Sequence, residues 1–97
     1  MTYPEAISQS EVVLVEFYAT WCPHCKQMMP IVEQVKELLE AQVPVLQLDI
    51  DENSEIADEN NVESVPTFII YKGGKEVWRH SGEIDGNNLY SKIQSYI

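Results

Sequence analysis

Cysteine is scarce in this chain: there are only two among 97 residues, and both lie in the segment Cys22–Cys25. A pair so close in sequence cannot close a long loop, which excludes a small secreted fold held together by several disulfides. Histidine is equally scarce, with His24 inside that segment and His80 outside it. A closed zinc site of four Cys and His ligands would lack donors, so no metal is expected. The two cysteines are therefore expected to serve chemistry.

Basic residues are also few, with 6 Lys and Arg against 16 Asp and Glu, a formal net charge of −10. Nucleic-acid binding depends on phosphate neutralisation by Lys and Arg, so no nucleic-acid partner is expected. Seven of the acids lie in Asp49–Glu63, which contains no Lys or Arg. This run is interpreted as a solvated face, and selection of partners by charge is the alternative.

Long apolar runs are absent as well. Runs such as Val12–Val15 fall far short of the ~18 residues of a membrane span, so no membrane partner is expected. The N-terminal Met1–Glu5 has neither the basic segment nor the apolar core of a secretory signal, although a trimmed mature domain would look identical. The cytoplasm is the expected location, with the periplasm as the alternative.

The chain length and the 44% of hydrophobic residues predict a single domain over residues 1–97. The hydrophobic pattern predicts helices and strands in the order α-β-α-β-α-β-β-α. Strands are expected over 11–19, 44–50, 67–71 and 75–80, and helices from Pro4 towards Gln9, from Pro23 to near Ala41, over 55–60 and after Asp85. A strand-helix-strand start implies a parallel crossover, and the Gly73-Gly74 turn adds an antiparallel edge strand. The expected fold class is α/β, a mixed four-stranded sheet with helices on both sides.

Cys22 and Cys25 lie where a predicted strand ends and a predicted helix begins. Unpaired N–H groups at the helix N-terminus would stabilise a thiolate at Cys22, and a thiolate is the nucleophile of disulfide exchange. Cys25, one turn later and expected to be the more shielded thiol, could close a disulfide or resolve a mixed disulfide. His24 offers a donor or positive charge beside the Cys22 sulfur; the alternative is a solvated residue with no chemical part. This pattern predicts thiol–disulfide exchange.

The segment Trp21–Lys26 (WCPHCK), which follows the first predicted strand, resembles the active-site segment of the thioredoxin family. Val65-Pro66-Thr67 is similar to the family's cis-proline signature, and Phe68–Gly74 to its closing hairpin. The resemblance covers residues ~11–97 in order, which is far more specific than an isolated CxxC. It implies a thioredoxin-like three-layer α/β/α sandwich.

The resemblance also implies how such a domain works. Protein disulfides and dithiols would be its substrates, held in a shallow groove lined by Trp21, Val65 and Pro66. The Cys22–Cys25 dithiol/disulfide couple would transfer the electrons without a bound cofactor. Thioredoxin reductase or another thiol protein would be the redox partner, and the domain would be a monomer.

Three features depart from the usual thioredoxin pattern. Pro23-His24, expected to tune the site, resembles the dipeptide of the disulfide-oxidase branch, whereas thioredoxins proper carry Gly-Pro. Glu16 stands at the position of the family's buried aspartate, which is thought to help deprotonate the resolving cysteine; a solvent-facing side chain on a one-sided strand is the alternative. Gln47 stands where thioredoxins often have a lysine, so a buried Glu16 is expected to stay protonated to higher pH.

The predicted function is that of a thiol–disulfide oxidoreductase which exchanges disulfides with protein substrates, its net direction left open. The alternative is a thioredoxin-fold binding or chaperone module with little redox turnover, against which the intact Cys22 and Cys25 argue. Two further expectations concern the helix after Pro23: Met28 and Met29 are both interpreted as ordinary packing residues, and Trp21 just before it as part of a substrate surface.

Overall fold

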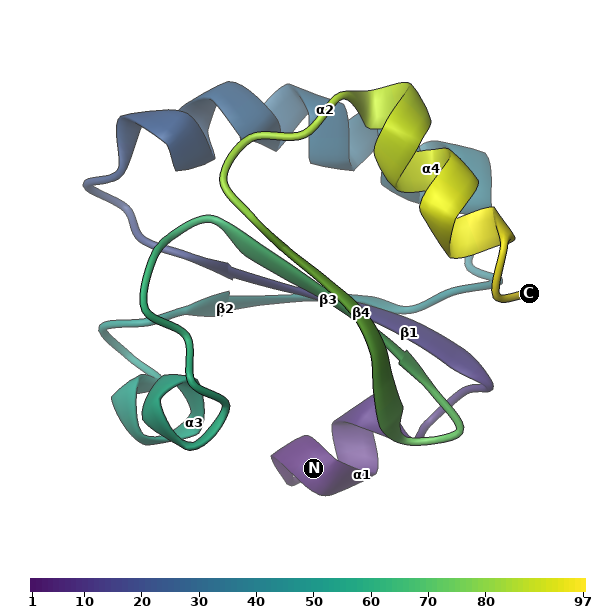
Figure 1. Ribbon diagram of the computed structural model, residues 1–97, viewed down its shortest axis with the longest axis horizontal. Coiled ribbons are helices and arrows are strands. Elements are labelled where there is room, and N and C mark those ends of the chain that lie inside the picture. Colours follow the sequence, from purple (N-terminus) through teal and green to yellow (C-terminus); the bar gives the residue numbers. More distant parts are fainter.

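The computed structural model describes residues 1–97 and contains all eight expected elements in the expected order (Figure 1). They are α1 (Tyr3–Ile7), β1 (Val12–Tyr18), α2 (Pro23–Leu39), β2 (Val45–Asp49), α3 (Ser54–Glu59), β3 (Thr67–Lys72), β4 (Lys75–Ser81) and α4 (Gly86–Gln94). None of the helices is both long enough and apolar enough to cross a membrane.

The four strands form one mixed sheet in the order β2-β1-β3-β4. β1 runs parallel to β2 and antiparallel to β3, and β3 pairs with β4 through the Gly73-Gly74 turn, where both glycines have positive φ. Helices α2 and α4 cover one face of the sheet, and α1 and α3 cover the other (Figure 1). The expected three-layer sandwich is thereby confirmed.

The central strand β1 is buried on both faces, as its apolar residues at both parities predict. Its even-numbered positions Val12 and Leu14 join the core under α2 and α4, while Val13, Val15 and Phe17 join the core over α1 and α3. Each fully buried side chain of this kind contributes about 1.5–3 kcal/mol relative to an exposed one. β1 is therefore anchored in the cores on both faces of the sheet.

Helix α2 begins at Pro23 with Cys22 as its N-cap and runs to Leu39 with Pro30 inside it. Pro23 suits this start because its fixed φ is helical and its missing N–H would have no partner in the first turn. Met28 is buried as expected, but Met29 is 62% exposed, so its interpretation as a packing residue was wrong. Met28 and Met29 lie about 100° apart around the helix, and only the first of them faces the sheet.

The starts of α3 and α4 differ in their capping. Asp85 caps α4, with its carboxylate accepting the N–H of Asn88 at 3.2 Å. Asn53 occupies the N-cap position of α3 but makes no capping hydrogen bond; its side-chain amide donates instead to the Asp49 carbonyl at 3.0 Å.

Candidate active site

The site lies between the end of β1 and the first turn of α2. The backbone N–H of Cys25 donates to the Cys22 sulfur at 3.1 Å, and the Cys22 thiol donates to the carbonyl of Val65 at 3.6 Å. The Val65–Pro66 peptide bond is cis, as the resemblance implies. The Cys22 sulfur is thus held by hydrogen bonds both to the first turn of α2 and to the loop that contains the cis-proline.

Both cysteines are free thiols, and each residue is only 3% exposed. The expectation that Cys22 is the exposed member of the pair was therefore wrong; the two differ in what surrounds them. Cys22 lines a surface groove, whereas Cys25 lines a cavity behind the helix. Burial, together with the hydrogen bond to Cys22, raises the pKa of the Cys25 thiol to about 12. Cys25 is consequently protonated at neutral pH and needs a proton acceptor before it can attack.

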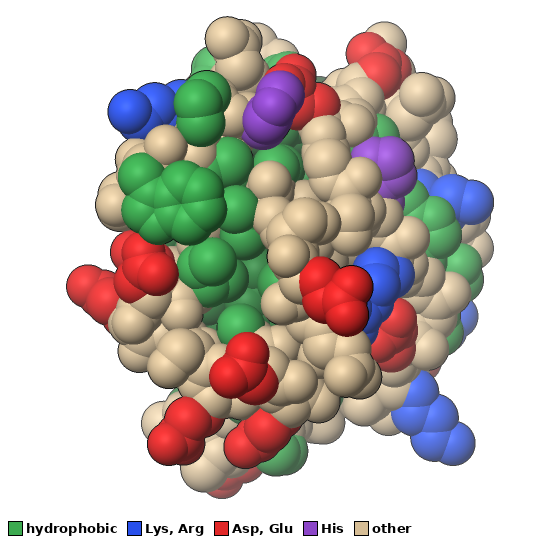
Figure 2. All heavy atoms as spheres, turned by 60° about the vertical axis from the view of Figure 1, so that its left-hand side comes forward, with side chains coloured by type: hydrophobic (Ala, Val, Ile, Leu, Met, Phe, Trp, Pro, Cys, Tyr) green, Lys and Arg blue, Asp and Glu red, His purple; other side chains and the backbone are tan.

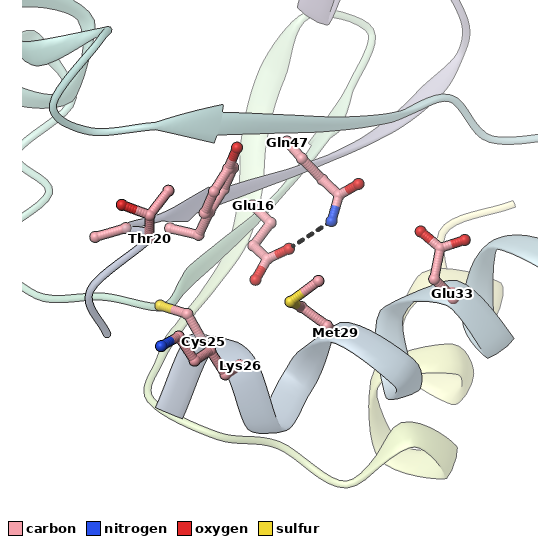
Figure 3. Close-up of a pocket in the computed structure, with 9 residues that line it drawn as sticks. Glu16, Thr20, Cys25, Lys26, Met29, Glu33 and Gln47 are labelled. Carbon is pink, nitrogen blue, oxygen red and sulfur yellow. Dashed lines mark hydrogen bonds between the residues drawn. The ribbon is translucent and has the colours of Figure 1, made fainter. Parts of the chain in front are cut away.

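The cavity beside Cys25 has a volume of about 410 Å³ and contains the side chains of Glu16 and Gln47 (Figure 3). Glu16 is 3% exposed, which confirms its interpretation as a buried carboxyl. Its Oε1 accepts a hydrogen bond from Gln47 Nε2 at 3.0 Å. The contact follows from strand register, because Glu16 on β1 is paired directly with Gln47 on the parallel strand β2.

Burial raises the pKa of Glu16, and the hydrogen bond from Gln47 opposes part of that rise. A neutral amide compensates a buried carboxylate less than the family's usual lysine would, so the direction of the shift agrees with the sequence-based expectation. Figure 3 shows Glu16 between Gln47 and the first turns of α2, on the side of Cys25 and Met29. The carboxyl is thus the group of the cavity that is suited to exchange a proton with the Cys25 thiol; that role stays a prediction.

The groove on the Cys22 side has a volume of about 320 Å³. It is lined by Trp21, Cys22, Pro23, His24, Ile50, Val62, Glu63, Ser64 and Val65. The indole of Trp21 is a surface feature, 62% exposed, with its Nε1 donating to Asp51 Oδ2 at 2.9 Å. Val65 lines the groove as expected, but Pro66 is buried and is not among the lining residues, which corrects the sequence-based prediction for that residue.

His24 lies on the rim of the groove, and its contact differs from the expected one. Its Nδ1 is 2.6 Å from Glu83 Oε2, in the loop between β4 and α4, so the ring is engaged by a carboxylate and makes no hydrogen bond with the Cys22 sulfur. The backbone carbonyl of Glu83 also contacts His80 Nε2 at 3.0 Å. Glu83 is a site residue that sequence reasoning missed, because 59 residues separate it from His24 and only folding brings them together.

The dithiol at a helix N-terminus, a cis-proline loop against it and a surface groove beside it define a thiol–disulfide oxidoreductase of thioredoxin-like fold. Comparison with known proteins supports this class. The thioredoxin family model matches residues 1–95. The chain belongs to the thioredoxin family.

Individual relatives agree. Chloroplastic thioredoxin Y from Oryza sativa subsp. japonica is 40% identical over 95 residues, which cover 97% of this chain but only 56% of the rice protein. A thioredoxin from Chlorobaculum thiosulfatiphilum is 36% identical over 93 residues, covering 96% of this chain and 86% of the relative. The solved structure of a Plasmodium falciparum thioredoxin has a TM-score of 0.87 at 34% identity and covers 98% of this chain and 91% of its own. These relatives are named thioredoxins, and the likeness of Pro23-His24 to the oxidase branch stays a prediction.

Proposed function

We propose that the domain works chiefly as a reductant of protein disulfides, with Cys22 as the attacking thiol and Cys25 as the resolving one. The observation that carries this proposal is the asymmetry of the pair. The Cys22 sulfur accepts an N–H at a helix N-terminus and borders a groove with apolar lining residues, whereas Cys25 borders a second cavity that holds the Glu16 carboxyl. Cys22 is positioned to react with a substrate disulfide, and Cys25 is positioned to transfer its proton to the carboxyl.

The Cys22 thiolate attacks one sulfur of a substrate disulfide, forms a mixed disulfide and releases the other substrate sulfur as a thiolate. Cys25 then loses its proton to Glu16 and attacks the Cys22 sulfur. This second step forms the Cys22–Cys25 disulfide and releases the remaining substrate thiolate. The substrate gains two electrons and the dithiol loses two, so the domain must be re-reduced by another thiol protein.

Regeneration by a thioredoxin reductase, a monomeric state and the absence of a bound cofactor belong to the same proposal. A similar structure, with a TM-score of 0.87 and 29% identity, comes from work on thiol resolution in a yeast mitochondrial 1-Cys peroxiredoxin through glutathione and thioredoxin systems. That precedent supports partners that are themselves thiol redox proteins. The relatives include bacterial and chloroplastic thioredoxins, and the cytoplasm stays the predicted location.

Reduction of insulin disulfides in the presence of dithiothreitol tests the function directly. We expect the domain to accelerate insulin precipitation, and the Cys22→Ser variant to have no effect above dithiothreitol alone. A domain that binds insulin chains but does not accelerate their reduction would support the alternative, a binding or chaperone module.

A further inference from the structure

The groove beside Cys22 has an apolar floor. Ile50, Val62 and Val65 line it, together with the exposed indole of Trp21. Figure 2 shows apolar side chains gathered on this face of the molecule, with acidic side chains along their lower margin. An exposed apolar surface next to a reactive sulfur is suited to an extended segment of another protein, whose apolar side chains it would cover.

The rim of the groove carries negative charge from three different loops. Glu63, between α3 and β3, lines the groove directly. Asp51, between β2 and α3, accepts the hydrogen bond of the Trp21 indole at 2.9 Å, and Glu83, between β4 and α4, contacts His24 at 2.6 Å. Three separate segments thus bring carboxylates to the margin of one apolar surface.

No lysine or arginine lines the groove. Arg79 is engaged by Glu76 at 2.9 Å, Lys36 by Glu33 at 3.5 Å, and Lys26 borders the cavity on the other side of the dithiol. His24 contacts the rim carboxylate of Glu83, but neither Asp51 nor Glu63 takes part in an ion pair. The net charge of the whole chain is −10. The potential at the mouth of the groove is therefore negative, and it acts on whatever approaches Cys22.

We propose that this groove selects protein segments in which Lys or Arg flanks the reactive cysteine and an apolar residue lies next to it. The proposal rests on the proposed function, because it names the substrate class of the same site. The apolar residue covers the floor formed by Ile50 and Val65, and the cationic side chains reach the rim carboxylates at Asp51 and Glu63. Charge complementarity of this kind acts mainly on the rate of encounter and is weakened by salt.

Two cyclic disulfide peptides of identical sequence, apart from two flanking Lys residues in one and two Glu residues in the other, provide the probe. The rate constant for reduction by the pre-reduced domain is measured for each peptide and divided by its rate constant with dithiothreitol, which removes differences in intrinsic reactivity. We expect the Lys peptide to react roughly tenfold faster at low ionic strength, with the advantage largely lost at about 0.5 M salt.

Glu63→Gln and Glu37→Gln form a matched pair of variants, because each removes one negative charge from an exposed position. Glu37 lies fifteen residues beyond Cys22 along the chain, about 22 Å at the rise of a helix and well beyond the Debye length of ~10 Å at 0.1 M salt. We expect Glu63→Gln to lower the preference for the Lys peptide about two- to threefold and Glu37→Gln to leave it unchanged.

The outcomes separate the two proposals. Reduction of both peptides at equal normalised rates, or faster reduction of the Glu peptide, would overturn the selection of cationic segments and leave the reductase function intact. An equal loss of preference in both variants would assign the effect to net charge and overturn the role of the rim. Failure to reduce either peptide would count against the proposed function itself.

Discussion

On the Cys22 side of the dithiol lies an open groove of about 320 Å³ with an apolar floor, whereas on the Cys25 side lies a cavity of about 410 Å³ with a buried carboxyl. The two thiols are equally buried and share one helix turn. What distinguishes the two thiols is therefore their neighbours: Cys22 lies beside an apolar groove, which we propose receives the substrate, and Cys25 lies beside the buried Glu16 carboxyl, which we propose accepts its proton. Attack and resolution can then be altered independently, and the experiments below exploit that difference.

The largest effect is expected from the thiols themselves. Cys25→Ser should abolish catalytic turnover and trap substrates on Cys22 as mixed disulfides, because no resolving thiol remains. Cys22→Ser should trap almost none, since Cys25 is buried and its raised pKa keeps it protonated. Non-reducing electrophoresis of both variants after incubation with an oxidised substrate distinguishes the cases. Equal trapping by Cys22→Ser would contradict the assignment of roles.

Glu16→Gln should slow resolution about 10- to 100-fold while changing the initial attack little, because it removes the proton acceptor on the Cys25 side. Only the carboxylate form can accept a proton. Since burial raises the pKa of Glu16, the resolution rate should increase with pH above the usual carboxyl range, and this inflection should vanish in the variant. Stopped-flow measurement of the two phases across pH provides the test.

Glu33→Gln is the matched control, because Glu33 lines the same cavity but has no hydrogen bond to Gln47. Its resolution rate and pH profile should be those of the parent protein. If both variants slowed resolution equally, the effect would be assigned to negative charge in the cavity. A specific proton transfer from Cys25 to Glu16 would then be contradicted.

The dipeptide between the cysteines acts on the Cys22 side. Whatever stabilises the thiolate favours the dithiol and raises the reduction potential, so we expect a value between the ≈ −270 mV of thioredoxin and the ≈ −120 mV of the strong oxidase, nearer the former. Pro23→Gly combined with His24→Pro should lower the potential by roughly 30 mV, a tenfold change in the equilibrium constant. Equilibration with glutathione measures it. A potential that stays constant or rises would show that the dipeptide does not determine the redox poise.

Substitution of Glu83 should change the reduction potential in the opposite direction from the dipeptide exchange, and by a smaller amount. Glu83→Gln removes a negative charge from the groove and releases His24 to approach the Cys22 sulfur, both of which favour the thiolate. The potential should rise by about 10–20 mV, limited by the solvent exposure of the His24–Glu83 pair. The same substitution in the double variant without His24 should have a smaller effect. If the two effects were equal, His24 would not mediate the influence of Glu83.

The smallest effect concerns the stability of the fold. The pKa of Glu16 is raised in the folded state, so its stabilising contribution, that of the neutral form, is complete below the unfolded pKa and is lost as pH rises through the folded pKa. Glu16→Gln should therefore match the parent in acid and exceed it in free energy of unfolding at neutral pH and above, by a small part of the 5–15 kcal/mol typical of a domain. Urea unfolding at several pH values measures this difference. A variant less stable than the parent at all pH values would show that the carboxyl is structurally required.

The order of the elements, the mixed sheet and the position of Cys22 at a helix N-terminus could all be predicted from the sequence. These features depend on local signals: the apolar residues of β1 at both parities, the proline that opens α2, and the Gly73-Gly74 turn. The contact between Glu16 and Gln47 could also be predicted, because parallel pairing of two recognisable strands places these residues side by side. Hydrophobic periodicity and turn-forming residues span only a few positions, so they can be recognised directly in the sequence.

The surroundings of the two sulfurs were decided only by the tertiary structure. The contact between His24 and Glu83 joins a helix start to a loop that follows the edge strand. Likewise, the Val65 carbonyl, next to the buried Pro66, accepts the Cys22 thiol from a segment more than forty residues earlier in the chain. The shielding of Cys22 has the same origin. Such contacts arise when segments far apart in the chain meet, and no local pattern encodes which side chains then face one another. The sequence by itself therefore determined the fold and the nucleophile, and the packing of distant loops decided what each thiol touches.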